Sequence, residues 1–339
     1  MSRTMRIRLS AMAFLGIMAA WAAAPAAAQG PGGGPPGGGG GNPATMTSLD
    51  FLRIQGVCRG CNFGAADLSG MRLTSKELPG SFLNGANLSG SDLRFAILSG
   101  SDLEGANLSG SNLTRASVDT TNLRQADLSQ ATLASTQLRD ADLSGANLQG
   151  ANLVSAFLQN ARLVGANLTD AAGERVQMPG AVLTSAILRR TSLEDVTCNN
   201  ADFSQADLTD AALRSFPGVG GCRCQGARFD GALLVRTDIS GCFFLFAFFE
   251  NANLSAARAV ETRFHSASFR GANLSGMDLS QAELHGAHLE NANLTGITCN
   301  GSLCQGAQPA GINFALFSNT ICPDGVTVGN SPADCGFSP

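Results

Sequence analysis

A five-residue repeat constrains this chain more than any other feature of its sequence. Between Leu68 and Leu213, every fifth residue defines 30 positions, and 25 of them are leucine. The residue two places before each of these positions is nearly always small, as in Ala86, Ala106 and Ala126. A period of five fits neither the 3.6-residue period of an α-helix nor the two-residue period of a flat strand. The chain must therefore turn regularly while it keeps one set of side chains inside.

The repeating unit is Ala-Asp/Asn-Leu-Ser-Gly, and the segment 141–153, ADLSGANLQGANL, shows it clearly. Because side chains alternate across an extended backbone, the Ala and Leu positions face inward and the Asp or Asn between them faces outward. The remaining two residues, often Ser-Gly, supply a bend. The pattern predicts a coil whose successive turns pair as parallel strands, about 4.8 Å apart.

This motif resembles the pentapeptide-repeat family over residues 58–315. The resemblance implies an all-β fold, a right-handed four-sided parallel β-helix with four five-residue units in each coil. Phe229, Phe249 and Phe269 are each separated by four units, as four sides require, but separations of three units also occur among the phenylalanines. From the residues alone, three sides therefore remain open.

The N-terminal segments predict an export signal and a tether. Residues 1–28 have a basic start, an apolar stretch and a small-residue cleavage site, which predicts a Sec-type signal peptide cut after Ala28. The apolar stretch is shorter than an ordinary membrane span. Residues 29–45 are rich in Gly and Pro and predict a flexible linker. Residues 46–57 predict an N-terminal cap that covers the first coil. We expect a periplasmic or extracellular protein with no membrane span after processing.

The second half of the repeat contains one break in register, at 214–218. Counting in fives, the next inward position after Leu213 is Val219, which predicts a one-residue insertion near Pro217. The five-residue spacing then continues through Leu294 and Cys304. Residues 316–339 predict a turn-rich C-terminal loop closed by cysteines.

All ten cysteines lie outside the expected leader, and an even number in an exported chain favours disulfides. Buried free thiols are the alternative for isolated cysteines, and a redox pair or half of a zinc site is the alternative for the CxxC at 58–61. Cys222 and Cys242 would stack in a four-sided coil. The expected pairs are Cys58–Cys61, Cys222–Cys242, Cys322–Cys335, Cys299–Cys304 and Cys198–Cys224, the last two by remainder.

No hydrolase or nucleotide-binding motif occurs, so we expect a non-enzymatic protein without a cofactor or a metal. The Asp and Asn residues mostly occupy the outward position and indicate a solvated surface. A zinc patch that involves His265, His285, His288 and Glu283 is conceivable, but surface histidines explain these residues better. Removing Arg3, Arg6 and Arg8 with the leader takes the formal charge from −4 to −7, which argues against binding nucleic acid.

One surface anomaly stands out, the segment CFFLFAFFE at 242–250. The register places Phe243, Leu245, Phe246 and Phe248 outward, and exposed apolar surface usually marks an interaction site. Cover by the insertion or by a C-terminal segment is the alternative. The arginines expected around this segment are Arg223, Arg228 and Arg263.

These features predict an exported structural or protein-interaction scaffold, with the segment Phe243–Phe248 as its contact patch and an unidentified protein or surface as its partner. A homodimer is compatible with the sequence. A carbohydrate- or surface-binding module is the alternative. A less favoured alternative comes from the family, some of whose members mimic duplex DNA and protect DNA gyrase, because those members act in the cytoplasm.

Overall fold

The computed structural model describes residues 56–215, 221–298 and 319–325. Contacts divide the chain into two units, Met1–Thr45 and Met46–Pro339, and every described residue belongs to the second. The expected leader and linker lie outside the described residues, as does the expected cap apart from residues 56 and 57. No helix long and apolar enough to cross a bilayer occurs in the described ranges.

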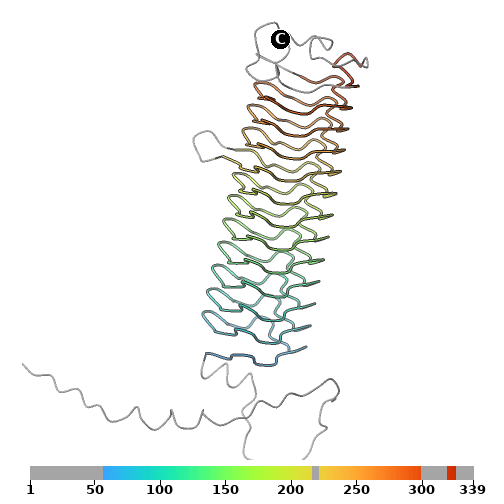
Figure 1. Cartoon of the computed structure of the whole chain (residues 1–339). Coiled ribbons are helices and arrows are strands. Elements are labelled where there is room, and N and C mark those ends of the chain that lie inside the picture. The colour runs from blue at the N-terminus through green and yellow to red at the C-terminus, as the bar shows by residue number, and fades with distance from the viewer. Residues whose placement is uncertain (1–55, 216–220, 299–318, 326–339) are drawn as a thin grey trace, which may run out of the picture. The chain divides into compact units, whose positions relative to one another are not determined.

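The described chain winds into four-sided coils that stack on one another (Figure 1). Each outward residue forms a parallel bridge with the residue four repeat units later, as between Asp67 and Asn87 or between Asn147 and Asn167. In the described ranges these rungs are isolated bridges, one residue on each side of every coil, because a bend follows before a longer strand can form. Four units in each coil give the coil four sides and exclude the three-sided coil that the sequence left open.

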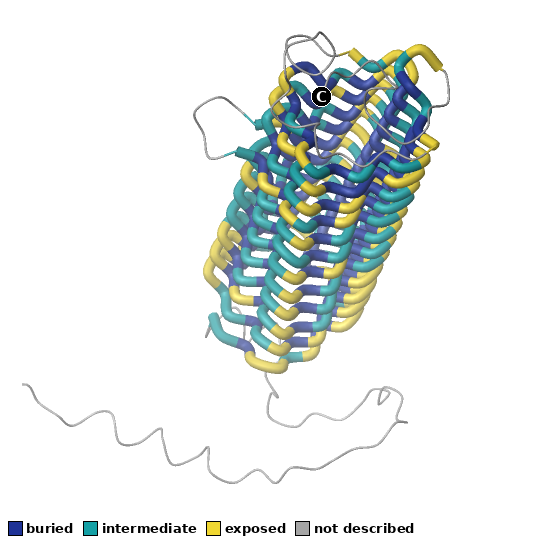
Figure 2. The backbone as a smooth tube through the Cα atoms, turned by 45° about the horizontal axis from the view of Figure 1, so that its top comes forward, coloured by how far each residue is buried: buried dark blue, intermediate teal, exposed yellow. Residues whose placement is uncertain are grey.

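We number the four faces by the order in which the chain crosses them. The first face carries the outward residues 57, 77, 97 and onward to 283, the second 62 to 288, the third 67 to 293, and the fourth 72 to 298. The corners between the first and second faces form what we call the first edge, which runs through 59–60, 79–80 and onward to 285–286. Buried, half-buried and exposed residues form continuous stripes along the stack (Figure 2).

The inward positions are buried as the repeat predicts. Leu148 and Ala151 have no exposed surface, and every other described leucine of the repeat column is exposed by 2% or less. The backbone is satisfied between coils, since the Leu148 amide donates to the Asn167 carbonyl at 2.7 Å. Each corner closes with a turn, such as the hydrogen bond from the Ala151 amide to the Leu148 carbonyl at 3.0 Å.

The second corner residue adopts a left-handed backbone, with φ of 64° at Gly150 for example. Glycine is common there because it lacks a Cβ. The outward Asp or Asn also serves the corner. The Asp142 carboxylate accepts a hydrogen bond from the Ser144 amide at 2.9 Å, and Asn147 donates its side-chain amide to Asp127 at 3.1 Å. The Asp and Asn residues of the repeat therefore stabilise turns and stack in ladders.

Buried Ser and Thr hydroxyls at the small inward position donate hydrogen bonds to backbone carbonyls inside the coil. Thr121 donates to the Leu98 carbonyl at 3.0 Å, and Thr262 donates to the Ile239 carbonyl at 2.9 Å. Such bonds let Ser and Thr replace Ala at the small inward position with the hydroxyl satisfied, although the hydroxyl of Ser91 is buried without a partner.

The interior changes from leucine to phenylalanine in the later coils. Phe203, Phe229, Phe249 and Phe269 form a parallel stack, with 4.8 Å between the ring centroids of Phe203 and Phe229 and 4.9 Å at the two following steps. Phe244 meets Phe249 edge to face at 5.4 Å. The regular recurrence of phenylalanine in the sequence therefore reflects rings that stack in one column.

The register break is larger than the one-residue insertion that the sequence predicts. Elsewhere each residue pairs with one four units later, but Thr197 pairs with Arg223 and Ala212 with Asp238, so the insertion is six residues long. Val219, the predicted next inward residue, lies outside the described residues. The next buried inward residues are Cys222 and Cys224. Counting in fives cannot distinguish the two cases, because insertions of one and six residues leave the same phase.

Beyond Thr298 the stack continues at 319–325, where Asn293 pairs with Ile321. Thr320 is buried and donates its hydroxyl to the Leu289 carbonyl at 2.7 Å. Cys304, which the repeat spacing places inward, is outside the described residues.

A candidate contact site on the first edge

The segment Phe243–Phe248 wraps around the first edge in one coil. Phe243 lies on the first face, Leu245 and Phe246 form the corner, and Phe248 lies on the second face. Phe246 is 54% exposed and Phe248 is 38% exposed, whereas Phe243 and Leu245 are half-buried. The alternating Phe244 and Phe249 are completely buried in the interior. One coil therefore combines a rigid aromatic interior with an aromatic surface.

Phe246 occupies a corner position whose backbone conformation is unfavourable for a residue with a side chain. Its φ is 57°, in the left-handed region where a side chain costs roughly 1–2 kcal/mol. Its ring is also the most exposed large apolar side chain in the described ranges. Neither property helps the fold, and the equivalent residue one coil earlier is Gly226. The second corner residue of nearly every unit shares this left-handed backbone, Phe95 included, so what distinguishes Phe246 is its exposed ring within a run of outward apolar residues in one coil.

Arginines stack on the aromatic rings of this coil. The Arg228 guanidinium lies 5.2 Å from the Phe248 ring centroid, and the Arg263 guanidinium lies 4.8 Å from the Phe243 ring centroid. Arg223 belongs to the same column, since it pairs with Phe243, which in turn pairs with Arg263. We call this set the basic aromatic patch. Its members are Phe243, Leu245, Phe246, Phe248, Arg223, Arg228 and Arg263.

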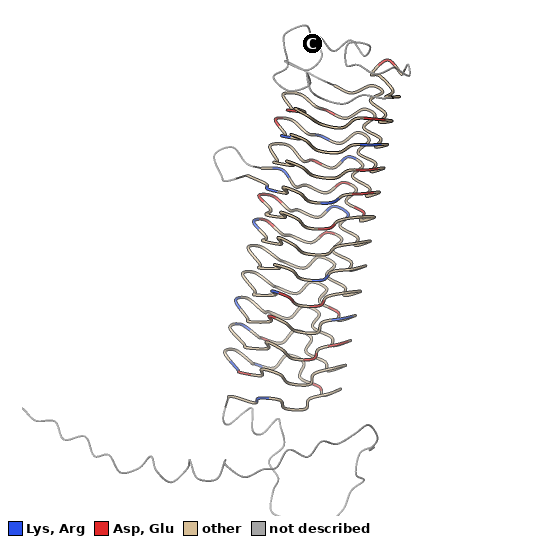
Figure 3. Ribbon diagram, viewed as in Figure 1, with Lys and Arg blue, Asp and Glu red and all other residues tan. Residues whose placement is uncertain are grey.

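Carboxylates next to the patch hold these arginines in place. Arg228 forms an ion pair with Asp230, and Arg263 reaches Glu283 at 3.4 Å. His265, at the corner one coil later, contacts Glu283 through Nε2 at 2.6 Å. Charges of both signs are distributed along the whole stack (Figure 3).

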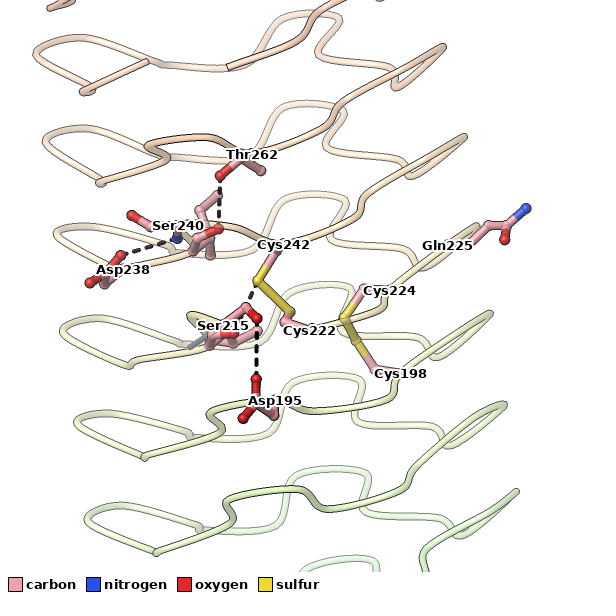
Figure 4. Close-up of a disulfide and its surroundings, with 12 residues drawn as sticks. Asp195, Cys198, Ser215, Cys222, Cys224, Gln225, Asp238, Ser240, Cys242 and Thr262 are labelled. Carbon is pink, nitrogen blue, oxygen red and sulfur yellow. Dashed lines mark hydrogen bonds between the residues drawn. A yellow bond between two sulfur atoms is a disulfide. The ribbon is translucent and has the colours of Figure 1, made fainter. Parts of the chain in front are cut away.

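Two disulfides fix the coils that carry the patch. Cys198 is bonded to Cys224, with 4.5 Å between the Cα atoms, and Cys222 is bonded to Cys242, with 4.7 Å between the Cα atoms. Figure 4 shows that these bonds link three successive coils. Because Cys222 and Cys224 flank Arg223, and Cys242 precedes Phe243, the crosslinks hold the backbone of the first face directly beneath the patch.

The other described cysteines, Cys58, Cys61 and Cys322, lie at the ends of the stack. Cys58 is bonded to Cys61 within the first coil, with 5.6 Å between the Cα atoms. Cys322 is buried and disulfide-bonded. Its expected partner Cys335 and the expected pair Cys299–Cys304 lie outside the described residues.

The histidines do not assemble a metal site. The rings of His265 and His285 meet edge to face at the first edge, with 6.1 Å between their centroids. His288 contacts Glu290 at 3.2 Å, away from the pair of His265 and Glu283. Within the described ranges, no group of three or more His, Cys, Asp or Glu residues could hold a metal ion.

The structure contains a second set of exposed apolar residues that was not predicted from the sequence. Phe82 is 52% exposed on the second face, Phe95 is 49% exposed at a corner, and Ile97 is 37% exposed on the first face. The same register that placed Phe246 outward would have found them. They are dispersed over four repeat units rather than gathered in one run, so no cluster is visible in the sequence.

The sequence profile of the family described as pentapeptide repeats matches this chain at residues 57–215, 220–255 and 260–296. None of the curated proteins gives a match.

Several solved structures are similar to the chain. HetL, a pentapeptide repeat protein involved in heterocyst differentiation regulation in the cyanobacterium Nostoc, is 27% identical and has a TM-score of 0.27; the match covers 84% of this chain and 100% of HetL. Rfr23 from the cyanobacterium Cyanothece is 26% identical over 40% of this chain and 97% of its own, with a TM-score of 0.21. A pentapeptide repeat protein of the Arabidopsis thaliana thylakoid lumen is 23% identical, with a TM-score of 0.20; the match covers 50% of this chain and 78% of that protein.

Proposed function

This chain belongs to the pentapeptide-repeat family, and on that premise we propose that it is an exported, non-catalytic scaffold that binds a protein partner through the basic aromatic patch. Proteins of this family are generally structural or interaction proteins rather than enzymes. The observation that carries the proposal is the exposure of Phe246 and Phe248 in one coil, where Arg228 and Arg263 stack on the rings of Phe248 and Phe243.

The composition of the patch suits a protein partner. Aromatic side chains and arginine are enriched in protein interfaces and dominate their binding energy. Arg228 and Arg263 are already oriented by Asp230 and Glu283 and by the rings beneath them, so less side-chain freedom is lost on binding. The disulfides and the stacked phenylalanines make the underlying coil a rigid support.

Export and crosslinking form the second half of the proposal. The leader-like residues 1–28 and the even number of cysteines support it. Disulfides at both ends of the stack, Cys58–Cys61 and Cys322–Cys335, would protect the open ends of the coil in an oxidising compartment. The Gly- and Pro-rich residues 29–45 would then act as a tether.

Mimicry of duplex DNA receives little support from the described surface. Such mimicry needs rows of unpaired carboxylates, whereas Asp207, Asp210 and Glu194 each pair with an arginine. Glycan binding is not favoured by any specific contact in the described ranges.

The test compares partner binding by the protein and by its Phe246→Ser/Phe248→Ser variant. Both residues are exposed, so the variant should keep the thermal stability of the parent protein. Proteins crosslinked to the parent protein in its own compartment should be purified and titrated against both forms. We expect at least a tenfold loss of affinity in the variant. The control is Leu233→Ser, which removes an apolar side chain that is 41% exposed on the third face. Equal affinity of all three forms would refute the proposal.

A further inference from the structure

The first edge carries a second patch, at the opposite end of the stack from the basic aromatic patch. Phe82 and Ile97 are its exposed apolar residues, at 52% and 37%. Arg59, at the first-edge corner one coil earlier, reaches Glu77 at 3.6 Å. The charged residues of the patch itself are acidic: Glu77 lies on the first face, Asp102 on the second face, and Glu104 at the following corner. We call these five residues the acidic aromatic patch.

The two patches are complementary in charge and similar in chemistry. Each one places an apolar residue on the first face and an exposed phenylalanine on the second face. Phe82 is followed in its column by Asp102, whereas Phe248 is preceded in the same column by Arg228. Exposed apolar groups at both sites are costly to leave in water. Carboxylates at one site and arginines at the other are the arrangement that steers and orients two surfaces.

We propose that two copies of this chain associate side by side and antiparallel along the first edge, so that the acidic aromatic patch of each copy covers the basic aromatic patch of the other. The inference rests on the proposed function, in which the basic aromatic patch is a contact surface, and it names a second copy as the occupant. Because both patches lie on the same edge, one twofold axis forms both contacts at once and closes the assembly.

The register of the columns supports this pairing. A twofold axis perpendicular to the stack sets the second face of one copy beside the second face of the other and reverses the order of the coils. When Phe82 meets Phe248 of the second copy, Asp102 meets Arg228, because each pair occupies adjacent coils in reversed order. On the first face the same register sets Glu77 opposite Phe243 and Ile97 opposite Arg223, so Ile97 is offset from Phe243 along the stack by one coil spacing of about 4.8 Å.

The length of the edge is sufficient for a stable dimer. Eight coil steps separate Phe82 from Phe248, which corresponds to about 38 Å. A strip of that length is compatible with the roughly 800 Å² that each partner buries in an interface of standard size.

The midpoint of the edge is also compatible with the dimer. Phe157 lies on the first face near the twofold axis, and the Arg139 guanidinium sits 5.1 Å from its ring centroid. On the second face, Arg162 of one copy lies opposite Arg162 of the other copy. Asp142, one coil away in the same column, is paired with Arg124 at 3.4 Å, so it offsets this like-charged contact only in part.

The experiment is sedimentation equilibrium of the purified protein and of charge-reversal variants at about 0.05 M and about 0.5 M salt. The protein should be a dimer whose Kd rises with salt. Asp102→Arg and Arg228→Asp should each raise the dimer Kd at least tenfold. An equimolar mixture of the two variants should restore dimers, because the arginine introduced in one chain then faces the aspartate introduced in the other, while the second contact keeps its native pair.

Two further variants separate the apolar contribution from folding. Phe82→Ser and Phe246→Ser/Phe248→Ser should each raise the Kd at least tenfold with unchanged thermal unfolding, and Leu233→Ser should leave the Kd unchanged. A parent protein that stays monomeric, or a mixture of charge-reversal variants that gains no dimer, would overturn the inference. If the parent is monomeric but the Phe246→Ser/Phe248→Ser variant loses a different partner, the proposed function survives and only the dimer fails.

Discussion

At the scale of single residues, each position of the five-residue unit has a separate physical task. The leucine fills the axis, the alanine leaves room for it, and the outward Asp or Asn accepts a hydrogen bond from the corner. The corner residue must accept a left-handed backbone. Gly173 shows how closely the interior is packed, since a Cβ added there would lie 2.8 Å from Cδ2 of Leu193. The leucine side chain of the following coil occupies the space that a larger residue at 173 would need.

Leu148→Ala tests the packing of the leucine column. Leu148 is fully buried, and the coils above and below it are held by backbone hydrogen bonds, so the gap cannot collapse. We expect the free energy of unfolding to fall by about 2–5 kcal/mol in denaturant titrations. The exposed Leu233→Ala should change it by less than about 0.5 kcal/mol. Equal effects of the two substitutions would show that Leu148 is not inside.

Phe246→Gly tests whether the corner phenylalanine was retained at the expense of stability. Glycine relieves the left-handed backbone, so the variant should gain about 1 kcal/mol of stability while its association weakens at least tenfold. Phe95→Gly is the matched control, because Phe95 has a φ of 59° and is 49% exposed at a corner outside the first edge. It should gain similar stability and leave association unchanged. A loss of stability in both variants would contradict this explanation.

At the scale of coils, the insertion is the place where the sequence predicted least. The repeat fixes only the phase of the chain, so one and six extra residues look alike, and the stacking partner of each coil decides between them. Cys198 and Cys224 carried the missing information, because their sequence separation of 26 matches the longer interval. The outward phenylalanines of the basic aromatic patch were visible for the opposite reason, as a dense run in a fixed phase. Phe82 and Ile97 were too far apart in sequence to suggest a patch.

Removal of a crosslink tests the role of the disulfides beside the insertion. Cys198→Ala/Cys224→Ala should lower the free energy of unfolding by roughly 3 kcal/mol, because the bond closes a long loop in the unfolded chain. Cys58→Ala/Cys61→Ala should cost less, since that bond closes only a short loop. Denaturant titrations of both variants and of the parent measure the difference. If reductant lowers the stability of the Cys198→Ala/Cys224→Ala variant as much as that of the parent, this bond contributes nothing.

Ion pairs between neighbouring coils predict that the thermal stability of the fold decreases in acid. Hydrogen bonds from Arg190 lower the pKa of Asp170, and hydrogen bonds from Arg236 lower the pKa of Asp210 across the insertion. A lowered folded-state pKa stabilises the fold above the unfolded pKa of about 3.9, and that contribution disappears as the pH falls through the folded value. The Tm of Asp170→Asn/Asp210→Asn should therefore lie below that of the parent at pH 7 and converge with it in acid. A Tm difference that does not depend on pH would show that these ion pairs do not stabilise the fold.

At the scale of the whole molecule, the stack of coils was predictable because one local rule is repeated in every coil. The family resemblance predicted four sides, and the bridges that join each residue to the one four units later confirm them. The complementarity of the two patches was not predictable from the repeat, because it depends on residues many coils apart that share one edge. Only the coil count between them, which the insertion changes, places Phe82 and Phe248 on the same face.

Export predicts a spectroscopic signature of the processed protein. The only tryptophan is Trp21, inside the expected leader, and the chain contains no tyrosine. Cleavage after Ala28 should therefore leave a protein that begins at Gln29, lacks tryptophan fluorescence and absorbs at 280 nm only through its disulfides. An Ala28→Phe variant should retain Trp21 and its fluorescence, because signal cleavage requires a small residue at that position. N-terminal sequencing and emission spectra of both forms, purified from the periplasm or the medium and from whole cells, make the comparison. Tryptophan emission from the parent protein in the exported fraction would show that the leader is not removed, and recovery of all the protein in the cytoplasm would refute export itself.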